Sequence, residues 1–285
     1  MTHLSAVREE VRFTPLDEAG LRSWCRPARF DWLDRLGTLP IADTELLNLS
    51  HHCPIAIRTL ATGPSVVCVV DSELLRVSRI NRHGRWTAPY APLALRSLPF
   101  RLAGAQGERG IEVALDIARA TDANEAALAL YGEDSKPSPD FAHVLTMLER
   151  LREGSSRLTD AAKLLVAADV LVPVATGRRS GAGPVLEVVS GERLGALSER
   201  RAAALTADDC LALDLAAASL FSQHWLAAEI LTERPAGIRG GMAAARGEAG
   251  PPHSLTEAIG DPVCMDESPL FSIDDYVASR ALPHD

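Results

Sequence analysis

Residues 54–80 read PIAIRTLATGPSVVCVVDSELLRVSRI and contain the clearest strand pattern in the chain. Three short runs rich in β-branched residues, PIAIRTL, SVVCVV and LLRVSRI, are separated by Gly63-Pro64 and by Asp71-Ser72. Short apolar runs bounded by turn residues are typical of β-strands joined by tight connections. The stretch therefore predicts three strands of an antiparallel sheet.

More strand-like segments follow this stretch. PFRLAG at 99–104 and GIEVALDI at 110–117 lie on either side of a glycine-rich turn, and PVLEVVS at 184–190 alternates before Gly191. Alternation of apolar and polar residues predicts strands with one buried face. We expect all three segments to be strands.

Between and after these strands the pattern is helical. Apolar residues at three-and-four spacing predict an amphipathic helix that starts after Ser138-Pro139: Phe141, Val144, Leu145, Leu148 and Leu151. Thr159 is a candidate N-cap for a second helix that runs to Ala168. Thr206, with Asp209 three residues later, predicts the longest helix, which would run to about Leu231 and lie buried.

Together these patterns predict an α+β fold, in which a mixed or antiparallel sheet from the N-terminal half is packed by helices of the C-terminal half. We expect an irregular lead-in at 1–39, the α+β domain at 40–233, a Gly-rich flexible linker at 234–252 and an acidic tail at 253–285. The tail keeps several apolar residues, so it either docks on the domain or is a linear motif for a partner.

Composition excludes several classes of protein. The formal net charge of −9 argues against non-specific nucleic-acid binding, which needs a basic surface. The N-terminus lacks the apolar core of a signal peptide, and the apolar run at 215–228 is too short to span a bilayer. The five cysteines are scattered and form no CxxC pair, so we expect reduced thiols in a cytoplasmic protein without a bound cofactor.

The segment at 85–100, RWTAPYAPLALRSLPF, is the leading candidate for a binding surface, and we call it the aromatic/proline segment. Its candidate peptide-binding residues are Trp86, Tyr90, Arg96 and Phe100, which lie among three prolines. Amphipathic rings and a guanidinium on a constrained backbone suit contact with another chain. The alternative is that these residues brace the segment as a structural corner.

A metal site is a competing interpretation. His51-His52-Cys53 contains three ligand types, but adjacent side chains diverge, so a further ligand such as His83 would be needed. The chain has no G-x-S-x-G motif for a nucleophilic serine. We therefore expect no catalytic residue, and we read the triplet as a loop that enters a strand.

The chain resembles the SapC-like family over roughly 40–231. The resemblance rests on CPIAIR, SVVCVV, VALDIA and GRWTAPYAPLALRSLPFRL, which is similar to the family pattern W-x-x-x-Y-x-P-x-x-x-R-x-x-PF. Further carrying pieces are LYGEDSKPSPDFAHVLTMLERL, LTDAAKLLVAADVLVPV and SERRAAALTADDCLALDLAAASLFSQHWL, where Ser219 looks like the family's helix serine. One departure is Leu95, where the family has a second arginine.

The resemblance implies a non-catalytic accessory protein, as in crocagin-type pathways, which holds a precursor peptide for tailoring enzymes that make ribosomally synthesised, post-translationally modified peptides. The expected partners are that peptide, a tailoring enzyme and, as an open alternative, a second copy of the chain. Two other hypotheses remain at this point. One is a metal- or thiol-dependent peptide-modifying enzyme, and the other is a scaffold in peptide or surface-protein transport.

Overall fold

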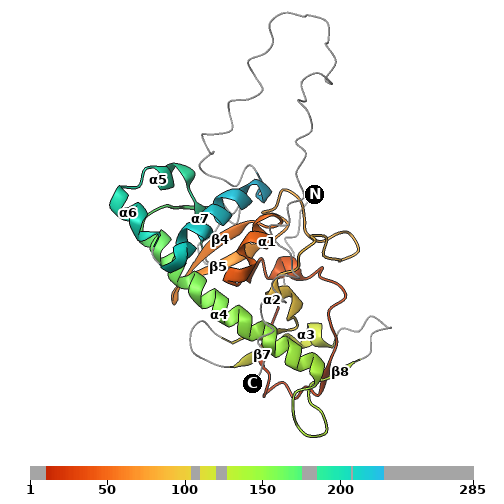
Figure 1. Cartoon of the computed structure of the whole chain (residues 1–285). Helices are drawn as coiled ribbons and strands as arrows, with labels where there is room; N and C mark the ends of the chain where they lie inside the picture. Colours follow the sequence, from red (N-terminus) through yellow and green to blue (C-terminus); the bar gives the residue numbers. More distant parts are fainter. Residues whose placement is uncertain (1–10, 104–109, 120–126, 175–184, 207, 228–285) are drawn as a thin grey trace, which may run out of the picture. The chain divides into compact units, whose positions relative to one another are not determined.

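The centre of the fold is an open antiparallel sheet of five strands, in the order β3-β5-β4-β10-β9 (Figure 1). The computed structural model describes residues 11–103, 110–119, 127–174, 185–206 and 208–227. The five strands are β3 (Thr38–Pro40), β4 (Ile55–Leu60), β5 (Gly63–Val69), β9 (Leu171–Pro173) and β10 (Leu186–Val189). Two small antiparallel sheets accompany it, and the predicted α+β class is confirmed.

The hairpin β4–β5 confirms two of the three strands predicted at 54–80. Its register runs from Ile55 opposite Cys68 to Leu60 opposite Gly63, and Gly63 has a φ of +122° at the turn. Only glycine adopts this φ without strain, which explains the tight connection.

The prediction of a third strand, LLRVSRI, is wrong, because this segment is not part of the main sheet. Leu75 forms a single bridge with Leu226, and the Arg76 N–H donates to the Trp225 carbonyl at 2.8 Å. The place beside β5 is taken by β3, which comes from the region predicted as an irregular lead-in. A run of apolar residues indicates extended, buried backbone, but it does not specify the partner.

The small sheets gather segments that are far apart in sequence. One has the order β1-β7-β6, and the other pairs β2 with β8. The strands are β1 (Thr14–Pro15), β2 (Ser23–Trp24), β6 (Phe100–Leu102), β7 (Ile111–Val113) and β8 (Leu128–Ala129). The predicted pair of strands at 99–104 and 110–117 is thereby confirmed in β6 and β7, while the end of the second segment forms the short helix α3 (Leu115–Ala118).

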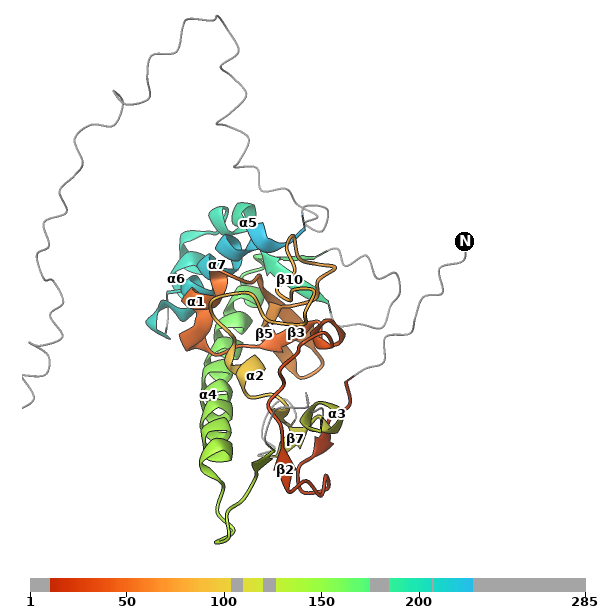
Figure 2. The same ribbon diagram turned by 90° about the vertical axis from the view of Figure 1, so that its right-hand side faces the viewer.

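The longest helix is α4 (Pro139–Ala167), which packs against β5 and against α7 (Leu211–Ser222) (Figures 1 and 2). The Ser138 side chain accepts a hydrogen bond from the Phe141 N–H at 3.2 Å, as an N-cap should. The two helices predicted here are one. Thr159 lies inside α4, where its hydroxyl donates to the Ser155 carbonyl at 2.9 Å instead of capping a new helix.

The predicted longest helix, from Thr206 to about Leu231, is wrong in both its start and its end. Asp209 and Cys210 have φ values of +60° and +63°, so helix α7 begins only at Leu211, and it ends at Ser222. It is buried on the face that carries Leu215 and Ser219, whereas Phe221 is 51% exposed. The remaining helical elements are η1 (Leu33–Arg35), η2 (Asp43–Glu45), α1 (Leu46–Ser50), α2 (Leu93–Arg96), α5 (Gly191–Gly195), α6 (Glu199–Ala204), η3 (Asp208–Cys210) and η4 (Gln223–Trp225).

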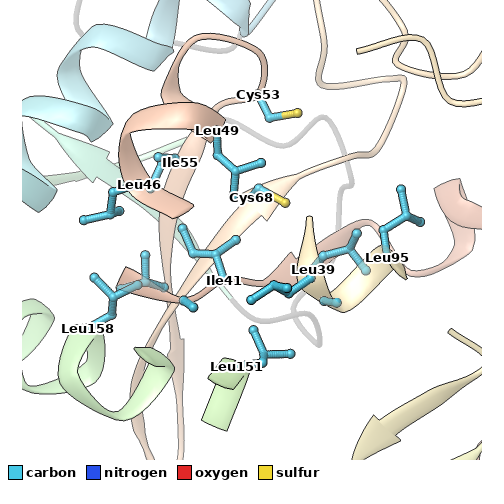
Figure 3. Close-up of a cluster of buried hydrophobic side chains, with 14 of the residues drawn as sticks. Leu39, Ile41, Leu46, Leu49, Cys53, Ile55, Cys68, Leu95, Leu151 and Leu158 are labelled. Carbon is cyan, nitrogen blue, oxygen red and sulfur yellow. The ribbon is translucent and has the colours of Figure 1, made fainter. Parts of the chain in front are cut away.

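The core lies between the main sheet and helices α1, α2 and α4 (Figure 3). Its labelled members are Leu39, Ile41, Leu46, Leu49, Cys53, Ile55, Cys68, Leu95, Leu151 and Leu158. Trp24, Leu33 and Leu39 are all buried in it, so the fold extends into the predicted lead-in at 1–39. Burial of such side chains stabilises the fold by about 1.5–3 kcal/mol each.

The chain divides into a unit over Met1–Ile238 and a second over Arg239–Asp285, and every described residue belongs to the first. The predicted linker at 234–252 and the tail at 253–285 lie outside the described residues. Among the helices of the described ranges, none has both the length and the apolar composition that crossing a bilayer requires.

Helix α7 is joined to the main sheet by a buried serine. The register of β4 with β10 would place Val189 opposite Ile55, but the Val189 N–H donates to Ser219 Oγ at 3.2 Å. The Ser219 hydroxyl in turn donates to the Ile55 carbonyl at 3.1 Å. Ser219, which is fully buried, thus supplies hydrogen-bond partners to backbone groups of both strands at the point where the strands separate.

We expect Ser219→Ala to lower the free energy of unfolding by about 2 kcal/mol, because it leaves a buried N–H and a buried carbonyl without partners. Denaturant titration measures the change, and Ser156→Ala, at an exposed position of α4, is the matched control with little effect. Equal stability of the two variants would contradict the bridging role.

Candidate functional site

The aromatic/proline segment forms a corner that closes on itself. The Trp86 Nε1–H donates to the Tyr90 carbonyl at 3.0 Å, and Trp86 pairs with Ile80 across the turn that precedes it. The Thr87 N–H donates to the Arg79 carbonyl at 2.9 Å. Helix α2 then follows, with Pro92 at its N-cap position. The half-buried Trp86 ring is therefore fixed by one hydrogen bond, and backbone hydrogen bonds hold the turn on which it lies.

A buried carboxylate holds this corner to the rest of the fold. Glu45, which is 1% exposed, accepts hydrogen bonds from the Tyr90 hydroxyl at 3.0 Å and from the Leu93 N–H at 2.7 Å on Oε1. Its Oε2 accepts from the Ala42 N–H at 2.9 Å. Three donors on two oxygens satisfy a carboxylate that has no water around it.

The electrostatics of this group follow from its burial. Desolvation raises the pKa of Glu45, while its hydrogen bonds and the nearby Arg96 guanidinium act in the opposite direction. Burial, together with the Glu45 charge, raises the pKa of Tyr90 to about 12. Tyr90 therefore keeps its proton at neutral pH and acts as a donor. Sequence reasoning missed Glu45, because two of its three partners, Tyr90 and Leu93, lie 45 or more positions away.

The four candidate peptide-binding residues divide into two groups. Trp86 and Tyr90 are half-buried and Arg96 is exposed, so each has surface that a partner can reach. Phe100 is 0% exposed and packs against the rings of Trp24 and Phe141, with centroids at 5.1 Å in both pairs. Phe100 therefore supports the segment from within the core.

The candidate metal ligands do not form a cluster. Among the residues described, no three His, Cys, Asp or Glu side chains come together around one position. His51 packs edge-on against Phe221 with ring centroids 5.0 Å apart, Cys53 is fully buried, and His83 lies in an exposed turn beside Arg82.

The buried thiols are unsuited to nucleophilic chemistry. Cys25, Cys53 and Cys68 are unpaired and buried, whereas Cys210 is unpaired and exposed. Burial raises the pKa of Cys53 to about 11, so that the thiolate is scarce at neutral pH. Burial also raises the pKa of Cys68 well above its ordinary value.

A surface groove lies between the N-terminal half of α4 and the β6–β7 hairpin. Its volume is about 660 Å³.

 The floor of this groove is apolar and its rim is polar. Leu102, Ile111, Leu145 and Leu148 line the floor, and Thr146, Glu149, Arg150 and Arg152 line the rim.

The two walls of this groove differ in kind. One wall is the face of the β6–β7 hairpin, because Leu102 and Ile111 lie directly opposite each other in the two strands and both line the groove. Among the described strands β6 pairs with β7 alone, so it is also an edge strand. The other wall is helix α4, where Arg152 Nε donates to Glu149 Oε2 at 3.0 Å. Arg150 forms no ion pair with any residue in the described ranges. An apolar floor beneath a polar rim with two arginines, beside an edge strand, suits an extended chain with apolar and acidic side chains.

The fold and the groove define an α+β protein with an open surface groove and, in the part of the chain described, no assembled metal cluster. The family model SapC matches residues 21–228, so the chain belongs to the SapC family. The match begins before the predicted domain start at residue 40, in agreement with the burial of Trp24 and Leu33. No curated protein and no solved structure matches the chain.

Proposed function

We propose that this SapC-family chain is a non-catalytic, peptide-binding accessory protein. It holds a precursor peptide for tailoring enzymes in the biosynthesis of a ribosomally synthesised, post-translationally modified peptide, and it does so in the cytoplasm. The observation that carries the proposal is the groove between α4 and β6. Its volume of about 660 Å³ falls in the range of ligand-binding clefts.

The chemistry of the groove supports a peptide as the ligand. The outer edge of β6 offers backbone groups to an added strand, in the way that sheet edges receive extended peptides. Leu145 and Leu102 offer apolar contacts, and Arg150 offers a guanidinium to an acidic side chain. The buried Cys53 thiol, with its pKa of about 11, gives the thiol-dependent enzyme hypothesis no support.

The proposal predicts that a precursor peptide of the same pathway binds, and that Leu145→Asp weakens its binding at least about tenfold. The reason is that a carboxylate on the groove floor loses its hydration when the peptide covers it. Isothermal titration calorimetry measures the affinity. Val166→Asp is the matched control, because Val166 is 48% exposed on the same helix and lies outside the groove lining.

We expect the control variant to bind as the wild type does. Absence of binding by the wild type at high peptide concentration would overturn the proposed function. Equal affinity of the Leu145→Asp and Val166→Asp variants would show that the peptide does not bind in this groove.

A further inference from the structure

Arg79 is a buried cation that forms no ion pair in the described part of the chain. The residue is 8% exposed, and its Nε and Nη2 atoms are buried without a hydrogen-bond partner. Its carbonyl accepts hydrogen bonds from the Thr87 N–H at 2.9 Å and from the Thr87 hydroxyl at 3.1 Å, so the backbone is fixed by the aromatic/proline segment. Burying a guanidinium group without a hydrogen-bond acceptor costs on the order of several kcal/mol.

Trp225 adds a third unused donor at the same place. The guanidinium carbon of Arg79 lies 4.1 Å from the centroid of the Trp225 ring, in a cation–π contact. The indole Nε1 of Trp225 is also buried without a partner. The Arg76 N–H donates to the Trp225 carbonyl at 2.8 Å and thereby holds the two segments together. Among the described residues these three buried nitrogen atoms have no acceptor, and the one side chain that hydrogen-bonds Arg79 is the Cys53 thiol. The position therefore suits a ligand that only accepts hydrogen bonds.

The neighbouring titratable groups do not neutralise Arg79. Burial raises the pKa of Cys53 to about 11, although the Arg79 charge opposes this rise, so Cys53 is a neutral thiol at pH 7. Burial lowers the pKa of His52, and Arg79 lowers it further, so His52 is neutral as well. The local charge is therefore positive.

Aromatic rings continue from this position to the surface. The His224 ring lies 4.4 Å from that of Trp225, and Phe221 lies 5.3 Å from His224. Phe221 is 51% exposed and also contacts His51. An apolar side chain can pack on these rings beside a group that binds at Arg79.

We infer that Arg79 and Trp225 form a carboxylate-binding site, which takes a carboxylate of a peptide flanked by an apolar side chain. Nε and Nη2 form one edge of the guanidinium, so the two oxygens of a carboxylate can accept from both at once. The carboxylate belongs either to the C-terminus of the peptide or to an Asp or Glu side chain. None of these residues lines the groove beside α4, so the inference does not rest on the proposed function.

Three capped dipeptides test the site on the full chain: acetyl-Ala-Phe with a free carboxylate, acetyl-Ala-Phe-amide and acetyl-Asp-Phe-amide. We expect the free acid, the Asp peptide or both to bind at least about tenfold more tightly than acetyl-Ala-Phe-amide, since charge-assisted bidentate bonds are lost in the amide. Calorimetry gives the affinities, and the comparison of the two acidic peptides identifies the source of the carboxylate.

Arg79→Met is expected to abolish this preference without lowering the melting temperature, because it removes a buried charge that has no ion-pair partner. A structural role alone would lower the melting temperature instead. If Arg79→Met is unstable, the carboxylate preference is measured in Arg79→Lys instead. Lysine keeps the positive charge but lacks the planar pair of donors that a guanidinium presents, so this variant should also lose the preference. No preference for a carboxylate in the wild type, or an unchanged preference in Arg79→Lys and Arg79→Met, would overturn the inference.

Discussion

Glu45→Ala is expected to lower the free energy of unfolding by about 4 kcal/mol, as measured by denaturant titration. The change leaves the Ala42 and Leu93 N–H groups and the Tyr90 hydroxyl without their common acceptor. Each unsatisfied buried donor costs about 1–3 kcal/mol, and the small cavity adds to the loss. The aromatic/proline segment should then lose its fixed position on the fold.

Glu45→Gln is the matched control, and we expect it to cost less than Glu45→Ala. The amide keeps one oxygen for Tyr90 and Leu93 but presents a donor to the Ala42 N–H. Equal stability of wild type and Glu45→Ala would show that the segment does not depend on this carboxylate.

The difference in stability between wild type and Glu45→Gln should depend on pH, and the direction of that dependence follows from the pKa of Glu45. Burial raises the pKa of Glu45 in the folded state above its ordinary value of 4.5, so the folded state binds the proton more tightly than the unfolded state. The stability that this difference contributes is fully present below pH 4.5 and is lost as the pH rises through the folded pKa. The stability of wild type relative to Glu45→Gln should therefore fall as the pH is raised from 4.5.

Gly154→Val is expected to lower the free energy of unfolding by about 3 kcal/mol, despite the poor helix propensity of glycine. A Cβ at Gly154 would lie 2.5 Å from the Ala42 Cβ and 2.6 Å from Asp43 Oδ1. Backbone atoms of Ala42 are also within 2.9 Å, so α4 or the turn before Glu45 must move. Arg157 pairs with Asp43 across the same contact, at 2.5 Å.

Gly195→Ala is the control for this prediction, because a Cβ at Gly195 in α5 would meet no atom within 4 Å. We expect its stability to be unchanged or slightly raised. A stable Gly154→Val variant would mean that α4 does not need a close approach to the turn at Ala42.

Features that depend on neighbouring residues could be predicted from the sequence. The β4–β5 hairpin follows from two β-branched runs around Gly63, and the start of α4 follows from the cap at Ser138 and from the apolar spacing after it. The SapC resemblance was likewise carried by continuous stretches, and the family match confirms it. Local periodicity and capping are encoded within a few positions, which is why these predictions succeeded.

Features that depend on distant partners could not be predicted. Two helices were predicted between Ser138 and Ala168, but they are the single helix α4, and Gly154 lies within it where the turn at Ala42 needs the space. LLRVSRI had the composition of a sheet strand, but it pairs with residues after α7. In both cases a contact across the fold outweighs the local preference.

The candidate site likewise has features that could be predicted from neighbouring residues and features that depend on distant ones. Residue types and spacing singled out the aromatic/proline segment and assigned the class of fold. The burial of Phe100, the role of Glu45 as its anchor, the groove beside α4 and the unpartnered Arg79 all arise from packing between segments that are far apart in the chain. Burial and hydrogen-bond satisfaction are properties of a three-dimensional environment, so the sequence names the residues while the folded chain sets which of them a ligand can reach.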